Sequence, residues 1–83
     1  MAVTYITGRL CYNYDVDRYG LVSDNQWADY GFHCGEPLEV LVDDVWVKTS
    51  MQLVSIVDGI REWGLVDTPY RGNLSNLTAR IVV

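Results

Sequence analysis

The sequence predicts an all-β fold: a small antiparallel barrel, SH3-like or similar, partly closed and built from roughly five to seven short strands. β-branched and aromatic residues recur in short runs that Gly, Asn, Asp and Pro separate, and helical periodicity is hard to find. The run from Val45 to Val57 would span roughly 40 Å as a straight strand, at about 3.3 Å per residue. It must therefore bend, as strands of small barrels do. With 83 residues, the chain forms one domain, residues 1–83.

Each expected strand is a run of alternating or β-branched residues bounded by turn formers. In chain order the expected strands are Val3 to Tyr12, Arg18 to Val22, Trp27 to Cys34, Leu38 to Val42, Val45 to Val57, Ile60 to Val66 and Leu77 to Val83.

The most informative segment is the hairpin expected around Asp43 and Asp44. If these two residues form the turn, one face of the hairpin is apolar and should pack into the core. Its pairs are Val42 with Val45, Val40 with Val47, and Leu38 with Thr49. The opposite face pairs Leu41 with Trp46 and Glu39 with Lys48. That face is free to meet a partner unless a neighbouring strand or the C-terminal segment covers Trp46.

A second hairpin is expected to turn at Asp58-Gly59. Simple pairing of Val57 with Ile60 would leave Trp63 outside the core, so we expect a β-bulge near the bend at residues 49–52. The bulge should bury Val54, Ile56, Trp63 and Leu65. A short helix from Gln52 to Trp63 is the alternative, although Gly59 argues against it.

Composition and charge restrict the function. Eleven acidic and six basic residues give a formal net charge of −5, which argues against nucleic-acid binding and suits a basic protein partner. The N-terminus lacks the pattern of a signal peptide, and no apolar run approaches the ~20 residues of a membrane-spanning helix. We therefore expect a cytoplasmic protein, without membrane contact, in which Cys11 and Cys34 are reduced.

Candidate chemical motifs are weak. Asp15 to Gly20 resembles the start of a calcium loop, but Tyr19 and Gln26 stand where ligands are needed. His33 and Cys34 are adjacent strand residues and should point to opposite faces, with Cys34 in the core and His33 on the surface. We expect no catalytic residue, no metal site and no cofactor, and hence no enzyme.

Several short segments together carry a family resemblance. They are Gly8-Arg9-Leu10, Arg18 to Leu21, Trp27, His33 to Glu36, Leu38 to Val40, Val42, Trp46-Val47, Thr49, Trp63, Leu65-Val66, Leu77 and Arg80-Ile81. In these the chain resembles the domain-of-unknown-function family 5348 of Gram-positive bacteria and their phages and mobile elements. The family's usual Arg-Ile-Glu after the hairpin is replaced here by Ser50-Met51-Gln52. The resemblance implies a cytosolic accessory protein and no catalytic residue.

The expected function is a non-enzymatic protein-interaction module, a monomer or weak homodimer. The expected binding residues are Glu39, Leu41, Asp43, Asp44 and Trp46, because a Trp anchor beside charge is typical of interface hot spots. The alternative is an acidic inhibitor that mimics nucleic acid, as phage counter-defence (anti-CRISPR-like) proteins do. Such a mimic needs its carboxylates clustered on one face.

Overall fold

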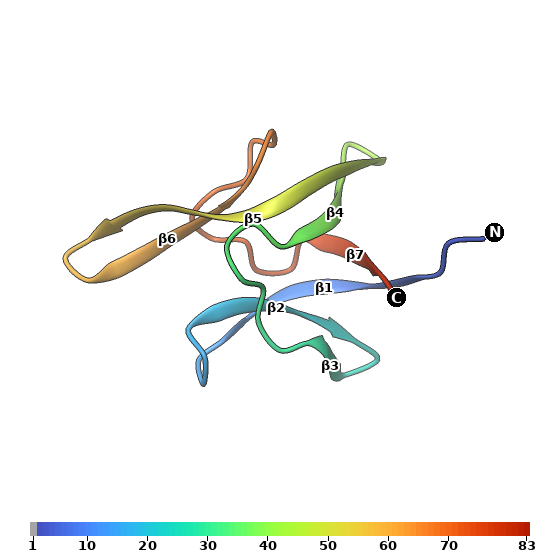
Figure 1. Ribbon diagram of the computed structural model, residues 1–83, viewed down its shortest axis with the longest axis horizontal. Helices are drawn as coiled ribbons and strands as arrows, with labels where there is room; N and C mark the ends of the chain where they lie inside the picture. The colour runs from blue at the N-terminus through green and yellow to red at the C-terminus, as the bar shows by residue number, and fades with distance from the viewer. Residues whose placement is uncertain (1) are drawn as a thin grey trace.

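The computed structural model describes residues 2–83, which form seven antiparallel strands and no helix. The strands are β1 (Tyr5–Asn13), β2 (Arg18–Ser23), β3 (Gln26–Asp29), β4 (Pro37–Val42), β5 (Val45–Val57), β6 (Ile60–Leu65) and β7 (Thr78–Val82). Their order in the sheet is β3-β2-β1-β7-β4-β5-β6. The strand group β1-β2-β3 and the group β4-β5-β6 lie on either side of the molecule, and β7 joins them (Figure 1). The prediction of an all-β, antiparallel, incompletely closed sheet is confirmed.

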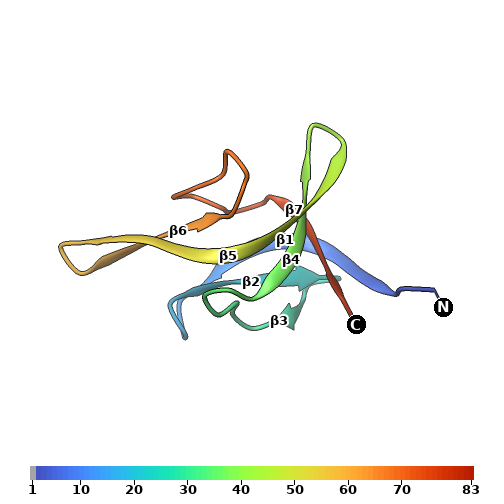
Figure 2. The same ribbon diagram turned by 45° about the horizontal axis from the view of Figure 1, so that its top comes forward.

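The β4–β5 hairpin has the predicted register. Val42 lies opposite Val45 and Val40 opposite Val47, while Leu41 and Trp46 form a pair on the other face. Val40 is completely buried, as the alternation predicts. Val45 is 61% exposed and does not join the core, because the turn end of the hairpin projects beyond the rest of the sheet (Figure 2).

Aspartate makes most of the tight turns. Three hairpins turn through two residues that both have positive φ, the backbone that a type I′ turn requires. The pairs are Asp24-Asn25 (52° and 61°), Asp43-Asp44 (47° and 66°) and Asp58-Gly59 (52° and 78°). Asp and Asn tolerate this left-handed region better than other side chains do, because their short polar groups bond locally to the backbone.

Strand β5 pairs first with β4 and then with β6. Its last pair with β4 involves Ser50, and its first pair with β6 joins Met51 to Leu65. The partner therefore changes within the stretch where the bend is expected. The segment from Gln52 to Trp63 is a hairpin, so the helical alternative is wrong.

A register shift interrupts the β5–β6 ladder between Leu53 and Ser55. The expected bulge is therefore real but lies slightly later than residues 49–52. Trp63 and Leu65 are buried, as predicted. Val54 and Ile56 are exposed, which corrects the prediction that the bulge buries them. Alternation places Ile56 on the same face of the hairpin as the buried Trp63, as predicted. Ile56 is nevertheless exposed, because this part of the hairpin extends past the end of the core.

The core lies between the two strand groups. Its completely buried residues are Leu10, Leu21, Phe32, Val40, Leu74 and Ala79. The connection between β6 and β7 closes one side of it: the Tyr19 hydroxyl accepts the Leu74 N–H (3.2 Å) and donates to the Gly72 carbonyl (3.3 Å). This single hydroxyl ties β2 to a segment more than fifty positions later in the chain.

Strand β3 ends at Asp29, earlier than the expected end at Cys34. The Asp29 carboxylate accepts the Gly31 N–H at 2.9 Å, which turns the chain away from the sheet. The alternation therefore stops, and Tyr30 and Cys34 are exposed, although Phe32 remains fully buried. The prediction that Cys34 lies in the core is wrong for this reason.

Candidate functional site

Four side chains meet on the outer face of the strands β1, β7, β4 and β5. They are Tyr5, Arg80, Glu39 and Trp46, and we call them the Arg80 cluster. Arg80 Nη2 donates to Glu39 Oε1 at 2.9 Å. The Arg80 guanidinium carbon lies 3.9 Å from the centre of the Tyr5 ring and 4.2 Å from that of Trp46. One cation is therefore held in contact with two aromatic rings and one carboxylate.

Strand register explains why these residues meet. Glu39 lies opposite Lys48 on β5 and opposite Arg80 on β7. Side chains of directly paired residues share a face and lie about 5 Å apart at Cβ, within reach of an ion pair. Glu39 thus stands between two cations.

The Glu39–Arg80 pair is well shielded from solvent. The side chains of Arg80 and Glu39 are 22% and 12% exposed. The hydrogen bond from Arg80 lowers the pKa of Glu39, and the positive charge of Lys48 acts in the same direction. Arg80 Nε is buried and has no hydrogen-bond partner within residues 2–83. Contact with the two rings offsets part of that loss, since a partly desolvated cation–π contact contributes about 0.5–2 kcal/mol.

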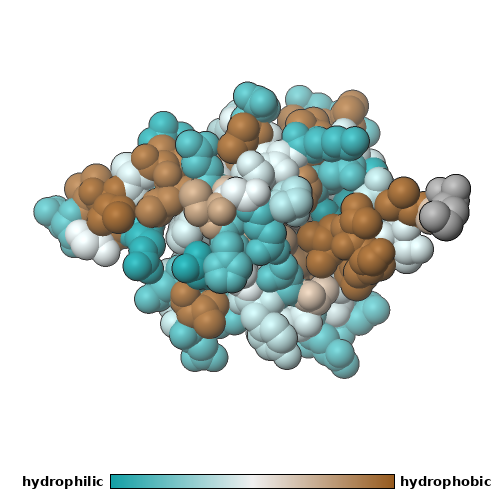
Figure 3. Space-filling model, in the orientation of Figure 1, coloured by the Kyte–Doolittle hydropathy of each residue, from teal (hydrophilic) through white to brown (hydrophobic). Residues whose placement is uncertain are grey.

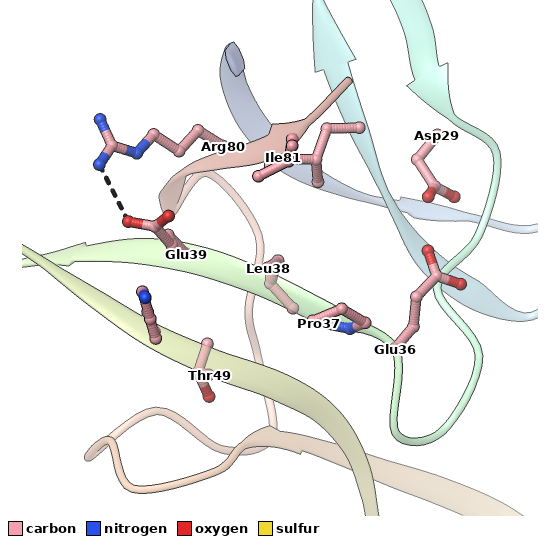
Figure 4. Close-up of a pocket in the computed structure, with 10 residues that line it drawn as sticks. Asp29, Glu36, Pro37, Leu38, Glu39, Thr49, Arg80 and Ile81 are labelled. Atoms are coloured by element: carbon pink, nitrogen blue, oxygen red, sulfur yellow. Dashed lines mark hydrogen bonds and ion pairs between the residues drawn. The ribbon is translucent and has the colours of Figure 1, made fainter. Parts of the chain in front are cut away.

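A cavity of about 450 Å³ adjoins the Arg80 cluster. It exists because the ladder between β4 and β7 contains only two pairs, Glu39 with Arg80 and Val40 with Ala79. Beyond these pairs the two strands separate and the cavity occupies the gap (Figure 4). The lining residues are Asp29, Glu36, Pro37, Leu38, Glu39, Lys48, Thr49, Arg80, Ile81 and Val82.

The end of the cavity farthest from Arg80 carries two carboxyl groups. Asp29 and Glu36 point toward one another there (Figure 4). Burial raises the pKa of Glu36, and the Asp29 carboxyl raises it further. The His33 N–H, which donates to Glu36 Oε1 at 3.2 Å, opposes the rise. Two carboxyl groups therefore line one end of the cavity, and the ion pair of Arg80 with Glu39 lies at the other end.

The structure brings together some of the residues expected to bind a partner. Glu39, Leu41 and Trp46 share one face of the β4–β5 hairpin, and Asp43 and Asp44 are exposed at its turn. Glu39 is buried in its ion pair rather than displayed. Trp46 is half-buried because Arg80, from the last strand, lies over it.

Sequence reasoning missed Tyr5 and Arg80. Both belong to this face only because β7 pairs with β1 and with β4, strands far away in the sequence. The one local signal in the sequence is that Arg80 stands between two apolar residues, Ala79 and Ile81, so that strand alternation places it on the opposite face from them. In the structure Ala79 is buried and Ile81 is partly buried.

The residues considered for metal or thiol chemistry do not assemble. His33 and Cys34 are exposed in the connection between β3 and β4, and Cys11 is a second free thiol on β1. No group of three metal-ligating side chains occurs in the described part of the chain.

The carboxylates are dispersed. Six aspartates occupy positive-φ positions in turns: Asp17, Asp24, Asp43, Asp44, Asp58 and Asp67. These turns lie at different ends of the molecule (Figure 1). Glu39 and Glu62 are neutralised by Arg80 and Arg71. The single acidic face that a nucleic-acid mimic needs is not formed by these eight residues.

The chain was compared with family models, with curated proteins and with solved structures. Neither the curated proteins nor the solved structures contain a significant match. Residues 2–83 include no helix with the length and apolar character needed to cross a membrane. The model of one family, described as a domain of unknown function (DUF5348), matches residues 8–81 and so covers all seven strands in whole or in part. The chain belongs to this family.

Proposed function

We propose that this protein is a non-enzymatic, cytoplasmic protein-interaction module whose binding face consists of the Arg80 cluster, Leu41 and the Asp43-Asp44 turn. The observation that supports the proposal most is the stack of Arg80 between Tyr5 and Trp46. Trp, Tyr and Arg are the residue types most enriched among interface hot spots. Here the three lie in contact on one surface.

The stack is preorganised. Arg80 is fixed by two rings and by Glu39, so little side-chain freedom remains to be lost when a partner binds. Trp46 and Leu41 each retain some exposed surface for a partner to cover. The adjoining cavity is large enough to receive a side chain of the partner.

Local charge suits a basic partner. Asp43 and Asp44 are adjacent and exposed at the edge of this face. Among the described residues 2–83, Lys48 is the only basic residue on this face that has no carboxylate within ion-pair distance. An interface between the acidic turn and a basic residue would add electrostatic steering to the aromatic contact. The dispersed carboxylates favour this reading over a nucleic-acid mimic.

The test compares single variants as bait in extracts of the cells that make the protein. Wild type, Trp46→Ala and Cys34→Ser are each verified to be folded by their thermal midpoints. A protein captured by wild type and Cys34→Ser should bind Trp46→Ala about 30-fold more weakly or worse, the loss expected for a hot-spot residue. If binding is lost in Cys34→Ser and kept in Trp46→Ala, the proposal is wrong and the exposed thiol is the better candidate.

A further inference from the structure

The far end of the β5–β6 hairpin is an apolar projection, which we call the finger. Its exposed aliphatic residues are Val54, Ile56, Val57 and Ile60. The hairpin extends along the long axis of the molecule, which measures 45 Å against 26 and 20 Å for the other two (Figure 1). Apolar side chains gather at its tip on the surface (Figure 3).

The finger is apolar on both faces. Val57 pairs with Ile60, and the next pair joins Ile56 to Arg61. Successive pairs in an antiparallel ladder alternate between faces, so Ile60 and Ile56 point to opposite sides of the ribbon. They are 72% and 60% exposed, and neither belongs to the core cluster.

Such an exposed β-branched hairpin is costly in isolation. A free two-stranded ribbon is marginal in water, and an exposed apolar strand is a site for association. Yet the local sequence specifies the finger well, through the Asp58-Gly59 turn with its two positive-φ residues. A well-specified apolar ribbon that extends past the core indicates a surface that another molecule covers when the protein functions.

The size and shape of the finger decide what covers it. A symmetric dimer through the finger would bury little more than the exposed surface of its four aliphatic side chains, on the order of 300–400 Å², well below the roughly 800 Å² that each partner buries in a standard stable interface. A cleft that encloses the ribbon would also bury its backbone and its polar side chains, so this limit does not apply to it. A symmetric dimer through the finger would also cover only one face. A bilayer could cover both, but Asp58 stands at the leading end and the chain carries −5, which anionic lipid surfaces repel.

We propose that the finger inserts into an apolar cleft of a partner protein whose two walls contact opposite faces of the ribbon. This surface is separate from the Arg80 cluster. Trp46 lies near the beginning of β5, whereas the finger is formed from its end.

The test places a photo-crosslinking residue at position 56, at position 60, or at the control position 30, in the full chain expressed in the cells that make it. Tyr30 is 70% exposed and so matches Ile60 without lying on β5 or β6. Positions 56 and 60 should crosslink to one and the same polypeptide, through different peptides of it, and position 30 should not. The crosslinks should persist in a Trp46→Ala background, which separates this inference from the proposed function.

The inference is overturned if only one face crosslinks, if neither position crosslinks, or if the product is a second copy of this chain. Binding of the purified protein to phosphatidylcholine or phosphatidylserine vesicles, lost on Ile60→Lys, would overturn it in favour of a lipid surface. Ile56→Lys and Ile60→Lys should each keep the wild-type thermal midpoint within a few degrees, because both side chains already lie in solvent.

Discussion

Val40 and Val45 provide a matched pair for testing how far the core extends along the β4–β5 hairpin. They are the same residue type on the same face, but Val40 is 0% exposed and Val45 61%. Truncation to Ala removes two methyl groups, each worth about 0.8 kcal/mol when buried, and at Val40 it also leaves a cavity beside Val47 and Ala79. We expect Val40→Ala to lower the free energy of unfolding by roughly 1–3 kcal/mol, and Val45→Ala by less than about 0.6 kcal/mol.

The assay is urea unfolding followed by tryptophan fluorescence, with the slope m compared among variants to verify that the change lies in stability alone. The expected loss at Val40 is a large share of the few kcal/mol available to a domain of this size. Equal losses at the two positions would refute the reasoning, because they would mean that burial does not distinguish the two ends of the hairpin.

Three further predictions concern other contacts. Tyr19→Phe should cost about 1–3 kcal/mol, measured by the same unfolding assay, because the buried Leu74 N–H loses its acceptor; a neutral result would mean that water replaces the hydroxyl. Gly8→Ala should lower the thermal midpoint far more than Gly35→Ala. A Cβ at Gly8 would collide with the Val22 carbonyl oxygen. A Cβ at Gly35 would meet open space, and only the φ of 89° at that position opposes a side chain. Glu36→Gln and Glu39→Gln should change the pH dependence of the thermal midpoint in opposite ways. Arg80 lowers the folded-state pKa of Glu39, so its contribution is present above the ordinary glutamate pKa and is lost as pH falls through the lowered value. Burial and Asp29 raise the folded-state pKa of Glu36, so its contribution is present at low pH and is lost as pH rises through the raised value. Midpoints that change in parallel for both variants would contradict this assignment.

Local chemistry made much of this fold predictable. The β4–β5 register follows from alternation around Asp43 and Asp44, since a one-residue slip would turn every valine to the other face. The need for a bulge in the second hairpin follows from the conflict between the Val57–Ile60 pair and the burial of Trp63. Both arguments use residues close together in the chain.

The Arg80 cluster could not be predicted in the same way. It depends on β7 lying between β1 and β4, and many arrangements of seven short strands satisfy the same alternation. Two other errors share a different cause. Alternation tells which face a residue occupies but not where the core ends, so Val45 and Ile56 were expected inside although they lie beyond it.

The aspartate turns make the acidity of this chain separable from its fold. Asp24, Asp43, Asp44 and Asp58 are selected by backbone geometry, a requirement that Asn meets equally well. Replacing these four by Asn would bring the formal net charge from −5 close to neutrality while leaving every ladder pair in place. The isoelectric point of this domain, and with it the charge of the molecules that it attracts, can therefore change widely at almost no cost in architecture.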